Sequence, residues 1–182
     1  TSAPSQSECT KCSPGEYQEV EGATRCKECD EGHYCKEGAS AQLLCDAGTH
    51  QPESGQSACL ACTEGHACPT GSVNQTACEP GSYGAGDLTN WLCQLCPGGS
   101  YQSRSMQTSC KACPSGSACP TGAEAATNCT AGTYTSVPSQ SECTKCSAGE
   151  YQDAEGATSC ILCTGGHYCK VGSSSPLPCP AG

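Results

Sequence analysis

The chain has 182 residues, of which 22 are cysteine, while phenylalanine is absent and tryptophan and methionine occur once each. Hydrophobic residues make up only 35% of the sequence even with cysteine included, which excludes an ordinary globular enzyme built on one apolar core. The formal net charge of -10, with eight Lys and Arg in total, argues against a nucleic-acid surface, and no apolar run approaches the length of a membrane span. So many cysteines are typical of a disulfide scaffold, which predicts an extracellular protein, secreted or at the cell surface.

The cysteines recur along the chain in two patterns. A short unit, C-x2-C followed by 13 residues, starts at Cys9, Cys93 and Cys143. A long unit, C-x2-C-x5-C-x9-C, starts at Cys26, Cys59, Cys110 and Cys160. Segments 1–48 and 135–182 share 33 identical residues of 48. The chain is therefore predicted to be a repeat protein.

The units are expected in the following order along the chain. They are 1–25 (a partial short unit), 26–58 (long), 59–92 (long, with an insertion), 93–109 (short), 110–142 (long), 143–159 (short) and 160–182 (long and truncated). Because each end falls inside a repeat, we expect the sequence to be a window from a longer array.

Glycine and tyrosine hold fixed places within these units. Eleven cysteines are followed three residues later by glycine, namely Gly15, Gly32, Gly48, Gly65, Gly81, Gly99, Gly116, Gly132, Gly149, Gly166 and Gly182. All seven tyrosines lie five residues after such a cysteine: Tyr17, Tyr34, Tyr83, Tyr101, Tyr134, Tyr151 and Tyr168. The glycine predicts a turn with positive φ, and the tyrosine is expected to enter a short strand and to cover the neighbouring disulfide. The predicted fold class is small disulfide-rich repeats, an elongated rod of short β-hairpins and turns without a single hydrophobic core.

The loop from Cys12 through Gly15 and Tyr17 to Cys26, like those of 96–110 and 146–160, has the pattern C-x-x-G-x-Y…S/T-x-C. This pattern resembles the loop of ephrin-receptor-like cysteine-rich repeats and of tumour necrosis factor receptor modules. The resemblance covers essentially the whole chain. It implies extracellular, elongated modules in which the cysteines before and after the loop are bonded to each other.

That loop rule implies a sequential set of disulfides. Its loops give Cys12–Cys26, Cys45–Cys59, Cys78–Cys93, Cys96–Cys110, Cys129–Cys143 and Cys146–Cys160. The cysteines left over then pair across five residues, as Cys29–Cys35, Cys62–Cys68, Cys113–Cys119 and Cys163–Cys169. Cys9 and Cys179 are expected to have partners beyond the sequence. Interleaved pairing within each long unit, such as Cys26–Cys35 with Cys29–Cys45, stays open as the alternative.

Metal binding and catalysis are weaker interpretations of the same residues. Cysteines 9, 12, 26 and 29 have zinc-ribbon spacing, but the other cysteines of the long units would then be free thiols. Each histidine lies one or two residues after a motif glycine: His33, His50, His66 and His167. A histidine at a repeated turn position is more typical of a solvated or ring-stacked residue than of a catalyst. The acidic residues Glu19, Glu21, Glu28, Asp30 and Glu31 are incompletely kept in the second copy, which favours a solvated face over a calcium site. No metal, cofactor or catalytic residue is predicted.

Two other features point to modification and contact. Asn74-Gln75-Thr76 and Asn128-Cys129-Thr130 are N-glycosylation sequons, so we expect covalent glycans, first of all on Asn74. Leu88 and Trp91 lie in the insertion of the 78–93 loop. They are either a contact patch for a neighbouring subunit or ligand, or, for Trp91, a cover for its own disulfide.

Two functions from different classes follow. The near-identity of the copies favours a structural segment of a glycosylated stalk, fibre or filament subunit, whose partners are neighbouring copies of itself or flanking repeats. The alternative is a receptor-type ectodomain that binds a protein ligand. Neither involves nucleic acid or insertion of this segment into a membrane.

Overall fold

The computed structural model of the chain describes residues 10–84 and 91–181. Within these ranges it contains twenty strands of two residues each and no helix. The strands are β1 (Glu16–Tyr17), β2 (Lys27–Glu28), β3 (His33–Tyr34), β4 (Leu43–Leu44), β5 (Thr49–His50), β6 (Leu60–Ala61), β7 (His66–Ala67), β8 (Thr76–Ala77), β9 (Ser82–Tyr83), β10 (Gln94–Leu95), β11 (Ser100–Tyr101), β12 (Lys111–Ala112), β13 (Ser117–Ala118), β14 (Thr127–Asn128), β15 (Thr133–Tyr134), β16 (Thr144–Lys145), β17 (Glu150–Tyr151), β18 (Ile161–Leu162), β19 (His167–Tyr168) and β20 (Leu177–Pro178). Nothing in the described part of the chain is a helix long and apolar enough to cross a bilayer.

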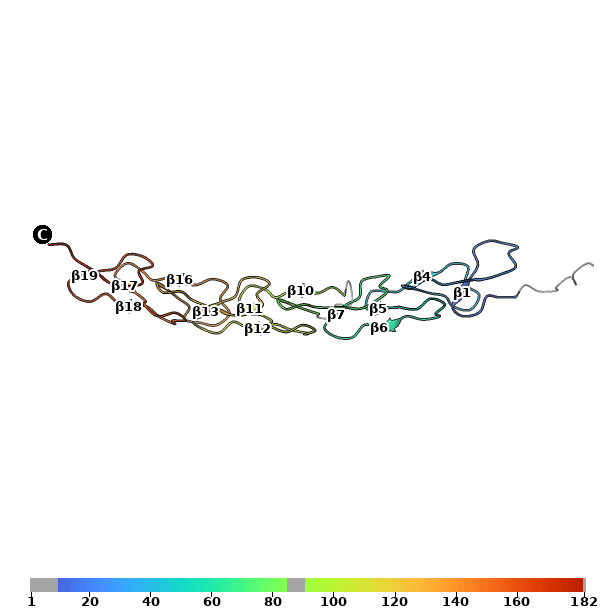
Figure 1. Cartoon of the computed structure of the whole chain (residues 1–182), viewed down its shortest axis with the longest axis horizontal. Helices are drawn as coiled ribbons and strands as arrows, with labels where there is room; N and C mark the ends of the chain where they lie inside the picture. The colour runs from blue at the N-terminus through green and yellow to red at the C-terminus, as the bar shows by residue number, and fades with distance from the viewer. Residues whose placement is uncertain (1–9, 85–90, 182) are drawn as a thin grey trace, which may run out of the picture. The chain divides into compact units, whose positions relative to one another are not determined.

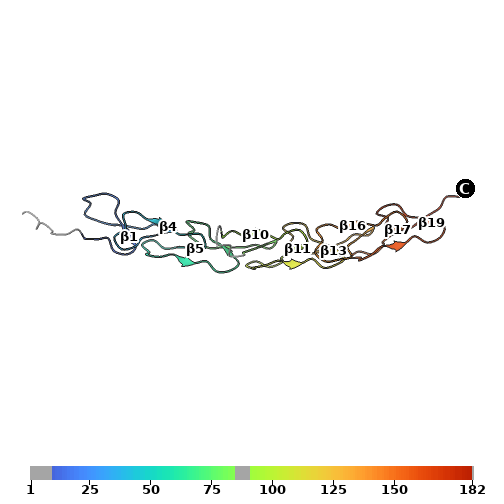
Figure 2. The same ribbon diagram turned by 180° about the vertical axis from the view of Figure 1, so that it is seen from behind.

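Consecutive strands pair as antiparallel hairpins, β1 with β2, β3 with β4 and so on to β19 with β20. The chain divides into two units, Thr1–Ala77 with Gly86–Leu92 and Cys78–Ala85 with Cys93–Gly182. The first contains the hairpins β1–β2 to β7–β8, and the second those from β9–β10 to β19–β20. Within each unit the hairpins follow one another in chain order in both views (Figure 1 and Figure 2). The predicted class of small disulfide-rich hairpin repeats is confirmed.

Each hairpin begins at a turn whose third residue is a motif glycine. In the turn before β13, the amide of Ser117 donates a hydrogen bond to the carbonyl of Pro114 at 3.2 Å, and Gly116 has φ of 79°. This is the value that the third position of a type II turn requires, and glycine adopts it without a steric cost. The ten motif glycines in the described ranges all have φ between 72 and 91°, which confirms the prediction from their spacing. Each tyrosine of the motif is the second residue of the strand that follows.

Successive hairpins within a unit are joined through the same glycine. The Gly116 amide donates to the carbonyl of Thr135 in the next hairpin at 2.9 Å, while the Gly116 carbonyl accepts from the Cys129 amide of its own hairpin at 2.9 Å. In the first unit, Gly15 donates to the carbonyl of Cys35 in the same way at 2.8 Å. A two-stranded hairpin is marginally stable by itself, so these bonds make each hairpin depend on its neighbour.

Cysteine makes up most of the buried apolar surface of the described residues. Ten cysteines have side chains less than 2% exposed: Cys29, Cys35, Cys45, Cys68, Cys78, Cys96, Cys113, Cys119, Cys129 and Cys146. In the second unit, Tyr101 and Ala126 pack against a buried cluster of Cys113, Cys119 and Ala123. Tyr101 therefore covers a disulfide as predicted, and disulfides take the place of a conventional core.

Glutamine fixes the long loops of four hairpins, a role that the sequence did not predict. Gln102 is 2% exposed, and its side-chain amide donates to the carbonyl of Ser109 at 2.7 Å while its side-chain oxygen accepts from the amide of Arg104 at 3.2 Å. The same pair of bonds recurs at Gln18, Gln51 and Gln152. A glutamine directly after the strand is the signal that would have identified these residues.

We expect Gln102→Ala to destabilise its loop by about 2 kcal/mol, because the amide of Arg104 and the carbonyl of Ser109 both lose a partly buried hydrogen-bond partner. The measurement is amide hydrogen exchange in residues 102–110. Gln94→Ala is the control, since Gln94 is exposed and its side-chain oxygen accepts from the hydroxyl of Tyr83 at 3.1 Å. Equal exchange rates in the two variants would contradict a structural role for the buried amide.

Candidate functional site

The cysteines of the described residues form ten disulfides that follow the sequential pairing. They are Cys12–Cys26, Cys29–Cys35, Cys45–Cys59, Cys62–Cys68, Cys78–Cys93, Cys96–Cys110, Cys113–Cys119, Cys129–Cys143, Cys146–Cys160 and Cys163–Cys169. The interleaved alternative is not formed. Within the described ranges Cys179 forms no disulfide and is exposed, and Cys9 lies outside them.

The zinc-ribbon spacings do not bring four thiolates together. Four cysteines with this spacing stand at positions 93, 96, 110 and 113. Two of them, Cys96 and Cys110, are bonded to each other. The other two are bonded outside the set, to Cys78 and Cys119. A cysteine in a disulfide has no thiolate to offer a metal.

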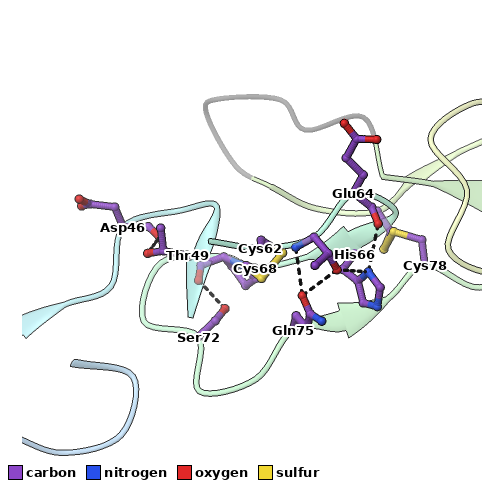
Figure 3. Close-up of a disulfide and its surroundings, with 12 residues drawn as sticks. Asp46, Thr49, Cys62, Glu64, His66, Cys68, Ser72, Gln75 and Cys78 are labelled. Carbon is purple, nitrogen blue, oxygen red and sulfur yellow. Dashed lines mark hydrogen bonds between the residues drawn. A yellow bond between two sulfur atoms is a disulfide. The ribbon is translucent and has the colours of Figure 1, made fainter. Parts of the chain in front are cut away.

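The histidines are held by local hydrogen bonds in their turns. The Nδ1 atom of His66 lies 2.9 Å from the hydroxyl of Thr63 and 3.1 Å from the carbonyl of Glu64, beside the Cys62–Cys68 disulfide (Figure 3). His33 makes the equivalent contact with the carbonyl of Glu31 at 2.9 Å. His50 differs, because it takes the tyrosine position in β5 and its Nδ1 atom is buried without a partner among the described residues.

The acidic residues of the first unit are spread over its surface. Glu19 accepts a hydrogen bond from the ammonium group of Lys27 at 2.5 Å, and this bond, then the charge of Glu19, raises the pKa of Lys27. Both side chains are about half exposed, at 55% and 53%, so the pair contributes little to stability. Asp30 instead accepts from the side-chain amide of Gln42 at 2.9 Å. In the part of the chain that the structure describes, no group of three or more acidic, histidine or cysteine side chains could hold a metal.

Trp91 packs inside the first unit. Its indole occupies the space where a Cβ on Gly48 would lie, and its carbonyl accepts a hydrogen bond from the amide of Cys68 at 2.9 Å. Trp91 is partly buried and has a positive φ of 45°. Leu88, the other residue of the predicted contact patch, lies outside the described residues. The described part of this patch therefore serves packing between hairpins.

The second strand of each hairpin carries exposed positions that vary between repeats. Ile161 and Leu162 in β18 stand where the other copy has Lys27 and Glu28 in β2. Apolar side chains on these strands are well exposed, with Leu95 at 65% and Leu162 at 75%. The cysteines and the motif glycines stay constant while this strand changes, and the tyrosine is kept in seven of the ten described hairpins. The side chains of the second strand therefore help to distinguish one hairpin from another.

A pocket of about 370 Å³, open to solvent, lies in the second unit. It is lined by Tyr83, Pro97, Ser100, Ser109, Cys110, Ala112 and Ser139. Its walls are an aromatic ring, small apolar groups and three serine hydroxyls. None of these described residues is a carboxylate, imidazole or amine that could serve as a general acid or base. The pocket offers a shallow contact surface rather than a catalytic cleft.

Comparison with known proteins identifies one family. The family model described as "Tyrosine-protein kinase ephrin type A/B receptor-like" matches residues 81–130, which span the hairpins β9–β10, β11–β12 and β13–β14. The same cysteine, glycine and tyrosine spacing continues on either side of the matched segment. No curated protein sequence matches the chain.

Proposed function

Because this chain is an ephrin-receptor-like cysteine-rich repeat protein, we propose that it is an extracellular structural segment, part of a cell-surface stalk or fibre in which stacked hairpins set a fixed spacing. The observation that carries this proposal is the hydrogen bond from a motif glycine to the next hairpin, which recurs at eight of the ten described motif glycines. Arrays of this kind gain stability from neighbouring repeats, and their length scales with repeat number.

The structural roles of the constant residues, within the part of the chain that the structure describes, support the same proposal. The constant residues of each repeat are committed to disulfides, turns and contacts between hairpins. Enzymes in contrast concentrate perturbed ionisable groups in one cleft. Family membership supports an extracellular location, and ten disulfides are suited to an oxidising compartment.

Electron microscopy of the native cell-surface material, labelled with antibodies against residues 1–48 and 93–142, tests the structural role. We expect labels at regular positions along stalks or filaments. Small-angle scattering of the isolated chain is expected to give the distance distribution of an extended particle, and reduction of the disulfides is expected to abolish it. Labels scattered over the cell surface, away from any stalk or filament, would contradict the structural role.

A receptor-type ectodomain that binds a protein ligand is the second candidate. The supporting observation is the set of exposed apolar side chains on the variable second strands, such as Leu95 and Ile161, because protein interfaces place apolar anchors on such surfaces. The matching family model is itself named for a receptor. Substitution of Leu95 by Glu separates the two roles, since it is expected to weaken binding of a ligand and to leave filament spacing unchanged.

A further inference from the structure

The two N-glycosylation sequons lie in different surroundings. Asn74 and Thr76 lie in the first unit at the start of β8, and Asn128 ends β14 in the second unit. An N-x-S/T sequon is modified only where the asparagine amide and the hydroxyl two residues later can both reach the transferring enzyme. The sequence already favours Asn74, and the structure shows how the surroundings of the two sites differ.

At the first sequon the middle residue is held by hydrogen bonds and the outer two residues are exposed. The side-chain oxygen of Gln75 accepts hydrogen bonds from the amide and the hydroxyl of Thr63, at 3.0 and 2.9 Å. Asn74 lies in a bend two residues before β8, and Thr76 is the first residue of that strand. Both of these residues are exposed, and within the described ranges no hydrogen bond engages the Asn74 side chain.

At the second sequon the acceptor amide is already engaged. Asn128 is exposed as a residue, but its side-chain oxygen accepts a hydrogen bond from the hydroxyl of Ser117 at 3.1 Å. Its amide nitrogen lies 3.6 Å from the place where a Cβ on Gly156 would be. The middle residue, Cys129, is 1% exposed and bonded to Cys143. The disulfide fixes the backbone through the centre of this sequon.

We propose that Asn74 carries an N-linked glycan and that Asn128 remains unmodified. The donor is an oligosaccharide linked through a diphosphate to a lipid. The amide nitrogen of Asn74 forms a bond to the anomeric carbon of the first sugar, the bond from that carbon to the diphosphate oxygen breaks, and the lipid diphosphate leaves with the electron pair. The nitrogen gives up one proton to the transferase, and no group is oxidised or reduced. The inference rests on the extracellular location of the proposed function.

Secretion of the chain from a eukaryotic host, followed by peptide mapping with and without peptide N-glycosidase, tests the proposal. Occupancy is read in both the secreted and the cell-retained fractions. We expect one enzyme-sensitive mass increment in the unmodified sequence and in Asn128→Gln, and none in Asn74→Gln or Thr76→Ala. An increment that persists in Asn74→Gln, or an unmodified Asn74 in secreted, fully oxidised chain, would overturn the inference and leave the structural role intact.

A double substitution tests why Asn128 is expected to carry no glycan. Cys129→Ser with Cys143→Ser keeps a sequon at Asn128 and removes the disulfide through it, so we expect Asn128 to become occupied. Occupancy is read in the secreted and the retained fractions alike, so the result does not require that the variant be secreted. If Asn128 stays bare in this variant, the disulfide is not what protects it, and that part of the inference is wrong. Retention of all variants as reduced chain would count against the extracellular function instead.

Discussion

Replacement of Gly116 by alanine is expected to open the β13–β14 hairpin. A Cβ at Gly116 would collide with the backbone carbonyl of Gly156, which belongs to a hairpin two places further along the unit. The backbone at Gly116 also has φ of 79°, which costs an alanine about 1–2 kcal/mol without any collision. A carbonyl held in its own hydrogen-bonded hairpin cannot move aside cheaply, so the total loss is expected to be at least twice that cost.

Gly149→Ala is the matched control, because it isolates the conformational cost. Gly149 has the same turn, a φ of 88° and the same donation to the next hairpin, to the carbonyl of Cys169 at 2.9 Å. No atom lies within 4 Å of its Cβ position among the described residues. Thermal unfolding and hydrogen exchange of both variants, with disulfides intact, make the comparison. Equal losses would mean that the close approach of the Gly156 carbonyl contributes nothing to stability.

The sequence predicted the local part of this fold because that part depends on residue types at fixed offsets. Glycine three residues after a cysteine predicted a positive φ, and tyrosine two residues later predicted a strand, and both predictions hold in the described hairpins. The contact of Gly116 with the Gly156 carbonyl was not predictable in the same way. Every residue has a backbone carbonyl, so no residue type in the sequence indicates this contact.

Three residues other than glycine have a positive φ that the sequence did not predict. Trp91, Met106 and Ser139 have positive φ values of 45, 58 and 62°. Met106 and Ser139 take the loop position that Gly55 and Gly156 hold elsewhere, and they donate their amides to the carbonyls of earlier cysteines, as those glycines do. The hydrogen bond between hairpins fixes the conformation here, and the side chain adapts to it. Sequence reasoning that expects glycine at such positions cannot find Met106 and Ser139.

The candidate functional surface was the least predictable feature. The insertion with the sole tryptophan drew attention as a contact patch, yet Trp91 lies against Gly48 inside the first unit. The exposed strand residues, such as Leu95 and Leu162, are ordinary apolar residues in the sequence. They become conspicuous only when the structure shows that the rest of each repeat is committed to disulfides and turns.

Removal of the Cys113–Cys119 disulfide, by alanine at both positions, is expected to destabilise the second unit by about 4 kcal/mol. Closing a loop of this size accounts for somewhat over 2 kcal/mol in the entropy model. The rest comes from packing, because both cysteines are 0% exposed and contact Ala123, Tyr101 and Ala126. Loss of two buried sulfurs leaves a cavity that two-residue strands have few other side chains to fill.

The Cys163–Cys169 disulfide provides a control with the same loop length, since both pairs have a sequence separation of six. Cys163 is partly exposed, unlike either cysteine of the buried pair, so its removal is expected to cost the loop entropy and little more. Native-state hydrogen exchange in β11–β14 and in β17–β20 measures the two losses separately. A larger loss at Cys113–Cys119 would establish that these disulfides act as the core of the repeat as well as its crosslinks. Equal destabilisation by the two removals would mean that the disulfides act only as crosslinks. The stability of the array would then depend on backbone hydrogen bonds between hairpins.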